Sequence, residues 1–131
     1  MILFVDASAM VAIMEREPDA SVLLERLGAA SRPLWSAMSC WETIISLKSS
    51  YKRSFERARH DTEVFADLMQ LQLVEVGEAE RAVALDAFER YGKGQHRARL
   101  NMGDCCAYAC AKTNDARLLY KGDDFTHTDM A

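Results

Sequence analysis

Short apolar runs alternate along this chain with longer segments in which apolar residues recur every three or four positions. The run "ILFV" near the start is typical of a buried strand, and similar short runs follow. We predict strands at residues 2–5, 33–37 and 73–76, and a fourth from 117, where "RLLYKGDDF" runs into a turn. The helical spacing predicts helices over 8–17, 19–30, 39–53, 56–70 and 78–91, and one more opened by Asp104.

The ends of these elements carry local signals. Pro18 ends the first predicted helix, because proline cannot continue a helical backbone. Ser39 is the predicted N-cap of the helix over 39–53, since Glu42 stands three residues later in a capping-box pattern. The polar, glycine-containing segment 92–101 is predicted to be a loop.

Strands that alternate with helices indicate an α/β domain with a mostly parallel central sheet and helices on both faces. We see no internal repeat, low-complexity segment or linker in the chain. The pattern therefore predicts a single domain over residues 1–131.

Composition narrows the class of protein. Half of the residues are hydrophobic and 27% are charged, as in soluble globular proteins. No apolar run approaches the roughly 20 residues of a membrane span, and "MILFVDAS" lacks the basic start of a signal peptide. We therefore expect a cytoplasmic protein without a membrane partner. The net charge of −4 means that a nucleic-acid partner would need a local basic patch.

The stretch "LNMGDCCAYACAK" holds three of the four cysteines. Zinc sites usually pair C-x-x-C with a second pair or with histidines, and the chain has no C-x-x-C. Alanines alternate with the cysteines, which favours a helix of small residues packed on a sheet. We interpret the three thiols as small buried hydrophobes: Cys105, Cys106 and Cys110.

Acidic residues follow the predicted strands. Asp6 ends the first strand, Glu42 lies in the first turn of the helix after the second, and Asp104 opens a later helix. Asp123 and Asp124 come just past the last strand. Singly, each is explained as a helix cap or turn residue. In a parallel sheet, however, strand carboxyl ends and helix N-termini share one edge, so we expect these acids to converge.

Converging carboxylates predict a metal site. They raise one another's pKa unless a cation relieves their repulsion. Oxygen ligands alone suit a hard ion, Mg²⁺ or Mn²⁺, rather than zinc. Such an ion activates water and neutralises charge that develops on a phosphate. The acids therefore predict metal-assisted hydrolysis of phosphodiester bonds.

The chain resembles the PIN-domain ribonucleases, specifically the VapC-type toxins of bacterial type II toxin–antitoxin systems. The resemblance covers essentially the whole length and rests on "FVDASAMVAI", "SCWETIISL", "RLNMGDCCAYACAK" and "LLYKGDDFTHTDMA". It implies a PIN-like three-layer α/β/α fold and a Mg²⁺-dependent endoribonuclease, with Mn²⁺ as the alternative ion. It also implies an RNA substrate, neutralisation by a cognate VapB-type antitoxin, and a homodimer.

By position, the resemblance implies four catalytic acids: Asp6, Glu42, Asp104 and Asp123. The first three correspond to the metal-binding residues. Asp124 competes with its neighbour for the fourth role, and Ser8 matches a small hydroxyl residue that supports the first aspartate or a water. The chain departs from the pattern at Met102 and Cys105, where aromatics are frequent, and this affects packing more than chemistry.

Two basic stretches offset the negative net charge. We interpret residues 48–60 as a solvated helix face. The loop before Asp104 carries cations and no acid, so we interpret it as a phosphate-contacting loop, which would position RNA without choosing a sequence. Its predicted RNA-binding residues are Lys93, Arg97 and Arg99. A subset of the apolar residues around Trp41 and Ile45 is a candidate dimer face or antitoxin groove.

Two other function classes stay open at this point. A phosphoaspartyl protein also has an aspartate after its first strand, but the haloacid-dehalogenase pattern needs an aspartate where Ser8 stands. A receiver needs a second acid before Asp6 and a late lysine, for which Lys121 is the candidate. A non-catalytic module that only binds nucleic acid or a partner would not need Asp6 or Asp104.

Overall fold

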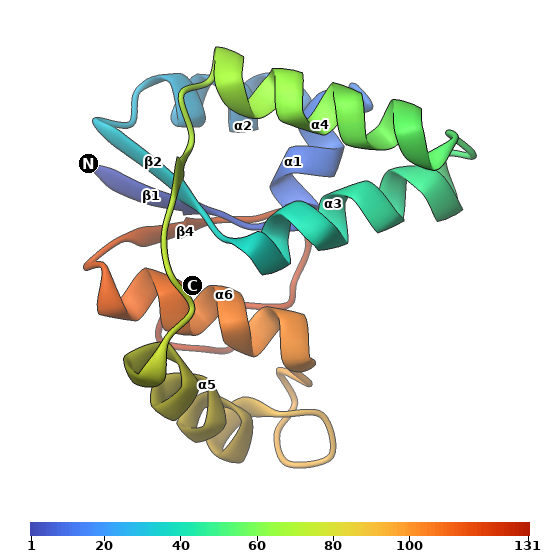
Figure 1. Ribbon diagram of the computed structural model, residues 1–131. Coiled ribbons are helices and arrows are strands. Elements are labelled where there is room, and N and C mark those ends of the chain that lie inside the picture. Colours follow the sequence, from blue (N-terminus) through green and yellow to red (C-terminus); the bar gives the residue numbers. More distant parts are fainter.

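The computed structural model describes residues 1–131, and it has helices on both faces of a four-stranded sheet (Figure 1). The strands pair in parallel in the order β3-β2-β1-β4 and comprise β1 (Ile2–Val5), β2 (Arg32–Trp35), β3 (Gln72–Leu73) and β4 (Arg117–Leu119). The helices are α1 (Ala7–Met14), α2 (Ala20–Gly28), α3 (Ala37–Ser50), α4 (Phe55–Leu68), α5 (Glu78–Tyr91) and α6 (Met102–Thr113). The predicted α/β fold with a parallel central sheet is confirmed.

Alternating side chains of the central strand supply both halves of the core, because successive residues of a strand point to opposite faces. Leu3 and Val5 pack with residues of α1, α2 and α4 on one face. Phe4 packs with α5 and α6 on the other. In Figure 1, α1, α2 and α4 lie on one side of the sheet and α5 and α6 on the opposite side. The layers therefore meet at β1, from whose end the first candidate acid emerges.

The cysteines of α6 are buried in the core that this helix shares with α5 and the sheet. All are free thiols. Burial raises the pKa of Cys105 to about 11, so this sulfur keeps its proton at neutral pH. The structure thus agrees with their interpretation as packing residues.

Several predicted boundaries are wrong, among them the start of α3 and the extent of the third strand. The predicted N-cap of α3, Ser39, is instead the third residue of that helix, and the capping box joins it to Ser36. Ser36 has the extended backbone of an N-cap because β2 already ends at Trp35, before the predicted residue 37. The third strand is also shorter than residues 73–76, since β3 lies at the edge of the sheet and both of its residues are exposed.

None of the helices combines the length and the apolar character that a span across a membrane requires.

Candidate active site

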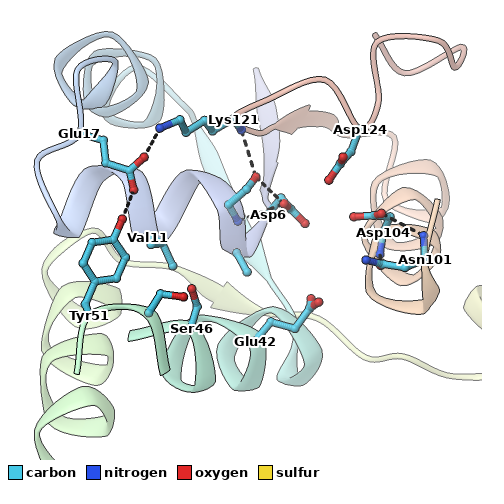
Figure 2. A pocket seen from close by; sticks show the side chains of 13 residues that line it. Asp6, Val11, Glu17, Glu42, Ser46, Tyr51, Asn101, Asp104, Lys121 and Asp124 are labelled. Carbon is cyan, nitrogen blue, oxygen red and sulfur yellow. Dashed lines mark hydrogen bonds and ion pairs between the residues drawn. The ribbon is translucent and has the colours of Figure 1, made fainter. Parts of the chain in front are cut away.

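A cavity of about 410 Å³ lies beside the carboxyl end of β1, and Figure 2 shows the side chains around it. Asp6, directly after β1, and Asp104, near the start of α6, face it together with Glu42 of α3. One lysine and five acids line the cavity; the acids are Asp6, Glu17, Glu42, Asp104 and Asp124. Three segments predicted to converge therefore do meet at one cavity.

Asp6 is fixed by neutral donors. It is the N-cap of α1 and is only 6% exposed. Its Oδ2 accepts hydrogen bonds from the Ser8 backbone N–H at 3.1 Å and from the Ser8 hydroxyl at 2.5 Å. That hydroxyl in turn accepts the backbone N–H of Lys121 at 3.0 Å. Ser8 thus ties the end of β1 to the segment after β4.

Asp104 is the third residue of α6 rather than the residue that opens it. Asn101 is the N-cap, and its Oδ1 accepts the Asp104 N–H at 2.9 Å. In return, Asp104 Oδ2 accepts the Asn101 N–H at 3.0 Å, which completes a capping box. Asp104 is 8% exposed, and Asn101 also lines the cavity. One carboxyl oxygen therefore holds the helix start, and the other is left without a protein donor.

Glu42 lies in the second turn of α3, not in the first turn as predicted, because the helix begins at Ala37. Its half-buried carboxylate accepts no hydrogen bond from the protein. It lies against Gly103 of α6, where even a methyl group would overlap the Glu42 carboxylate oxygens. Gly103 therefore permits the close approach of Glu42 to the start of α6.

Burial and mutual repulsion make these carboxyls weaker acids. Burial raises the pKa of Glu42 to about 7, and the charges of Asp6 and Asp104 add to the effect. Burial likewise raises the pKa of Asp104 to about 6 against its hydrogen bond from Asn101, with Asp124 and Asp6 adding. Burial also raises the pKa of Asp6, although the hydrogen bonds from Ser8 oppose the shift. The cavity is therefore short of positive charge.

The segment after β4 brings Asp124 to the cavity, where Figure 2 shows its carboxylate beside Asp104. Asp123, the favoured fourth acid, does not line the cavity, although both aspartates are exposed. Of the two adjacent acids, only Asp124 therefore lies at the cavity. The loop cations Lys93, Arg97 and Arg99 are exposed and lie outside the cavity.

The donors around the cavity fit a hard divalent cation in chemistry, since they are carboxylate oxygens with raised pKa values. In their present positions, no three histidine, cysteine, aspartate or glutamate side chains are close enough together to hold a metal ion. The donor set therefore matches such an ion in chemistry, whereas the present spacing of the carboxylates would not hold one.

Lys121 does not support the receiver interpretation. Its ammonium pairs with Glu17 and, at 3.7 Å, with Asp19, whereas only its backbone N–H reaches the Ser8 hydroxyl beside Asp6. A receiver lysine would instead be expected beside the aspartate that is phosphorylated. Sequence reasoning missed Glu17 and Tyr51 as cavity residues because nothing local marks a pairing of segments so far apart. Asn101 could have been found from its position three residues before Asp104, which is a capping-box spacing.

Comparison with known proteins gives a consistent result. Residues 3–130 match the family model of the PIN domain. The chain is 36% identical over 127 residues to VapC ribonuclease Mb0640 of Mycobacterium bovis, and the matched region covers 97% of this chain and 95% of that protein.

Two solved structures share the fold at 17% sequence identity and a TM-score of 0.74 each. One is Mycobacterium tuberculosis VapC20, described as a toxin that cleaves the sarcin–ricin loop, and it covers 98% of this chain and 96% of that chain. The other is VapBC2 of Rickettsia felis bound to a DNA fragment from its promoter, which covers 99% of this chain and 95% of that chain.

The raised pKa values predict that the metal-free protein loses stability as pH rises. Glu42, with its pKa of about 7, keeps its proton in the folded state above 4.5, the ordinary value at which the unfolded chain releases it. The stabilisation is thus complete below about pH 4.5 and lost by about pH 7. Since one pKa unit is worth about 1.4 kcal/mol and solvent screens a half-buried group, we expect the free energy of unfolding to fall by roughly 2 kcal/mol.

Urea unfolding in a chelator, from about pH 5 to about pH 8, measures this loss. Glu42→Gln should remove most of the dependence, and Glu25→Gln, at an exposed glutamate of α2, should retain it. Mg²⁺ should restore more stability at the higher pH. Equal pH dependence in the wild type and Glu42→Gln would show that burial and repulsion do not raise the pKa of Glu42.

Proposed function

This chain belongs to the PIN-domain family, and from that membership we propose that it is a metal-dependent endoribonuclease that acts in the cytoplasm as the toxin of a type II toxin–antitoxin pair. One observation carries the proposal: carboxylates from four separate segments line a single cavity that holds only one cation. That arrangement serves a reaction in which a divalent ion meets a phosphodiester. The relatives named VapC ribonuclease support the same reaction.

We assign metal binding to Asp6, Glu42 and Asp104, with Mg²⁺ as the preferred ion and Mn²⁺ as the alternative. Such an ion, when bound, supplies the Lewis acidity that activates water and offsets charge on the phosphate. Uncharged hydrogen-bond donors orient the aspartates: Ser8 donates to Asp6, and the backbone N–H of Asn101 donates to Asp104. Because those donors carry no charge, they do not neutralise the negative charge that the ionised aspartates present to the cavity.

For the fourth acid we propose Asp124 in place of Asp123. Asp124 lines the cavity, and its charge contributes to the raised pKa of both Asp6 and Asp104. A carboxylate in that position can help to hold the ion or orient a water. The neighbouring Asp123 does not line the cavity.

An antitoxin is the partner we propose, since the structural neighbours include a VapBC assembly. An apolar groove of about 730 Å³ between α3 and α4 is lined mostly by hydrophobic residues, among them Trp41, Ile45 and Phe55. Trp41 is 65% exposed, and a hollow next to this groove includes Glu42. An amphipathic helix docked there would reach the acidic cavity. A homodimer also remains part of the proposal, and its interface is not assigned.

Loss of either central aspartate should abolish cleavage. Asp6→Asn and Asp104→Asn each remove a charge that we assign to metal binding, so we expect activity to fall by more than about a hundredfold. The measurement is sequencing of new RNA 5′ ends after incubation of bacterial total RNA with the protein, in Mg²⁺ and in chelator. Near-wild-type cleavage by a folded Asp104→Asn protein would refute the mechanism, and equal cleavage in chelator would refute metal dependence.

Adjacent aspartates provide a matched test of the fourth acid. Asp124→Asn should lower the cleavage rate at a mapped site by about tenfold or more, whereas Asp123→Asn should leave it within about twofold. Both changes remove one charge from the same turn. The reverse order of effects would restore Asp123 as the catalytic acid.

The basic loop is tested by salt dependence. Loss of two phosphate contacts should make the slope of log affinity against log salt concentration shallower by about 1.4 for single-stranded RNA. We therefore expect that change in Arg97→Ala/Arg99→Ala, with Mg²⁺ affinity retained. Arg57→Ala/Arg59→Ala, on the exposed face of α4, is the matched control and should keep the wild-type slope. An unchanged slope in the loop variant would exclude the loop from RNA binding.

A further inference from the structure

The cavity has one cationic side chain, Lys121, against five acids. If the proposed function holds, a polyanion has to enter this cavity. At the acidic side a bound metal ion would offset the negative charge, but away from it Lys121 is the only positively charged side chain that the wall offers to a phosphate group. The cations of the basic loop lie outside the cavity and do not serve that position.

Lys121 is held at both ends. Its backbone N–H donates to the Ser8 hydroxyl at 3.0 Å, and that hydroxyl donates to Asp6. Its ammonium donates to Glu17, whose other carboxylate oxygen accepts the Tyr51 hydroxyl at 2.7 Å. The hydrogen bond to Glu17 raises the pKa of Lys121, so the ammonium stays charged. The position of the Lys121 ammonium relative to Asp6 is therefore fixed before any ligand binds.

The ammonium lies apart from the acids proposed to bind metal. Figure 2 shows Lys121 extending away from Asp6 toward Glu17 and Tyr51, with Asp104 at the opposite side of the view. Ser46 and Ser50 also line the cavity, and Figure 2 shows Ser46 between Glu42 and Tyr51. They follow Glu42 at intervals of four residues along α3, so all three lie on one face of the helix. A polar path therefore leads from the acids to Lys121.

We propose that Lys121 binds the phosphate group next to the scissile phosphate of an RNA strand laid along α3. If the scissile phosphate of an RNA strand lies at the acids, the next phosphate of the same strand comes toward the lysine along this path. An ammonium is a compact donor for phosphate oxygens. The side chain is 36% exposed, so part of it stays open to a ligand while the ammonium is paired with Glu17. Lys121 thus helps to select the register in which a strand is cut.

The test uses a short RNA that spans a cleavage site mapped as described above, with kcat and KM measured in Mg²⁺. Lys121→Met should raise KM about tenfold, equal to about 1.4 kcal/mol, and change kcat little. The slope of log(kcat/KM) against log salt concentration should become shallower by about 0.7. Lys121→Arg, which keeps the charge, should restore both values to within about twofold of wild type.

Two controls separate phosphate binding from a structural role. Glu17→Gln removes the charge of the ion pair but keeps a carbonyl oxygen that can accept a hydrogen bond from the lysine, so it should leave KM within about threefold of wild type. Lys112→Met removes a lysine that is 38% exposed and paired with Asp129 outside the cavity, and it should have no effect on KM or on the salt slope. If Lys121→Met does not fold, Glu17→Gln/Lys121→Gln is compared with Glu17→Gln instead.

The outcomes are distinct. Cleavage with unchanged KM and salt slope in Lys121→Met would overturn the role of Lys121 and leave the proposed function intact. An equal rise of KM in Glu17→Gln would show that the ion pair acts structurally, and it would overturn the phosphate contact. If the wild-type protein cleaves no RNA in Mg²⁺, the proposed function fails, and this inference fails with it.

Discussion

Parallel pairing of β1 with both of its neighbours is the constraint on which the acidic cavity depends. In the register, Phe4 lies opposite Leu34 on one side and Leu118 on the other, so the three strands end nearly level. The chain after each strand therefore emerges at the same edge of the sheet. Asp6 follows β1, α3 with Glu42 follows β2, and the turn with Asp124 follows β4. An antiparallel neighbour would send its following residues to the opposite edge.

Repulsion among the buried carboxylates of the cavity opposes folding. Hydrogen bonds from the surrounding protein hold two of these carboxylates in place without neutralising their charge. The hydrogen bonds to Asp6 and Asp104 come from a hydroxyl group and from backbone amides rather than from lysine or arginine. The core packed on both faces of the sheet holds the backbone that carries these donors. The protein thus fixes where the carboxylates stand and leaves their charge available to a ligand. Acids balanced by internal ion pairs would be more stable and would bind a cation less well.

The sequence predicted the features that depend on local patterns. The alternation of strands and helices, the acid after β1 and the acid at the start of α6 follow from short-range spacing. Local patterns could not choose between Ser36 and Ser39 as the cap of α3, because both are serines before a helical run and the outcome depends on where β2 ends. Adjacent acids after β4 were likewise indistinguishable, since the preceding Gly122, at φ +91°, sets the direction of the turn. The pair of Glu17 with Lys121 spans 104 positions and leaves no local trace.

At Gly103, the arrangement of the cavity lowers the stability of the helix that carries it. Glycine in a helix is less favourable than alanine by up to about 1 kcal/mol, and α6 accepts this in its first turn, where the Glu42 carboxylate occupies the space of a side chain. An alanine at this position would favour the helix and would at the same time displace the Glu42 carboxylate. Replacement of helical glycines is a general route to thermostability, but at this position it would push the Glu42 carboxylate out of its place beside the cavity.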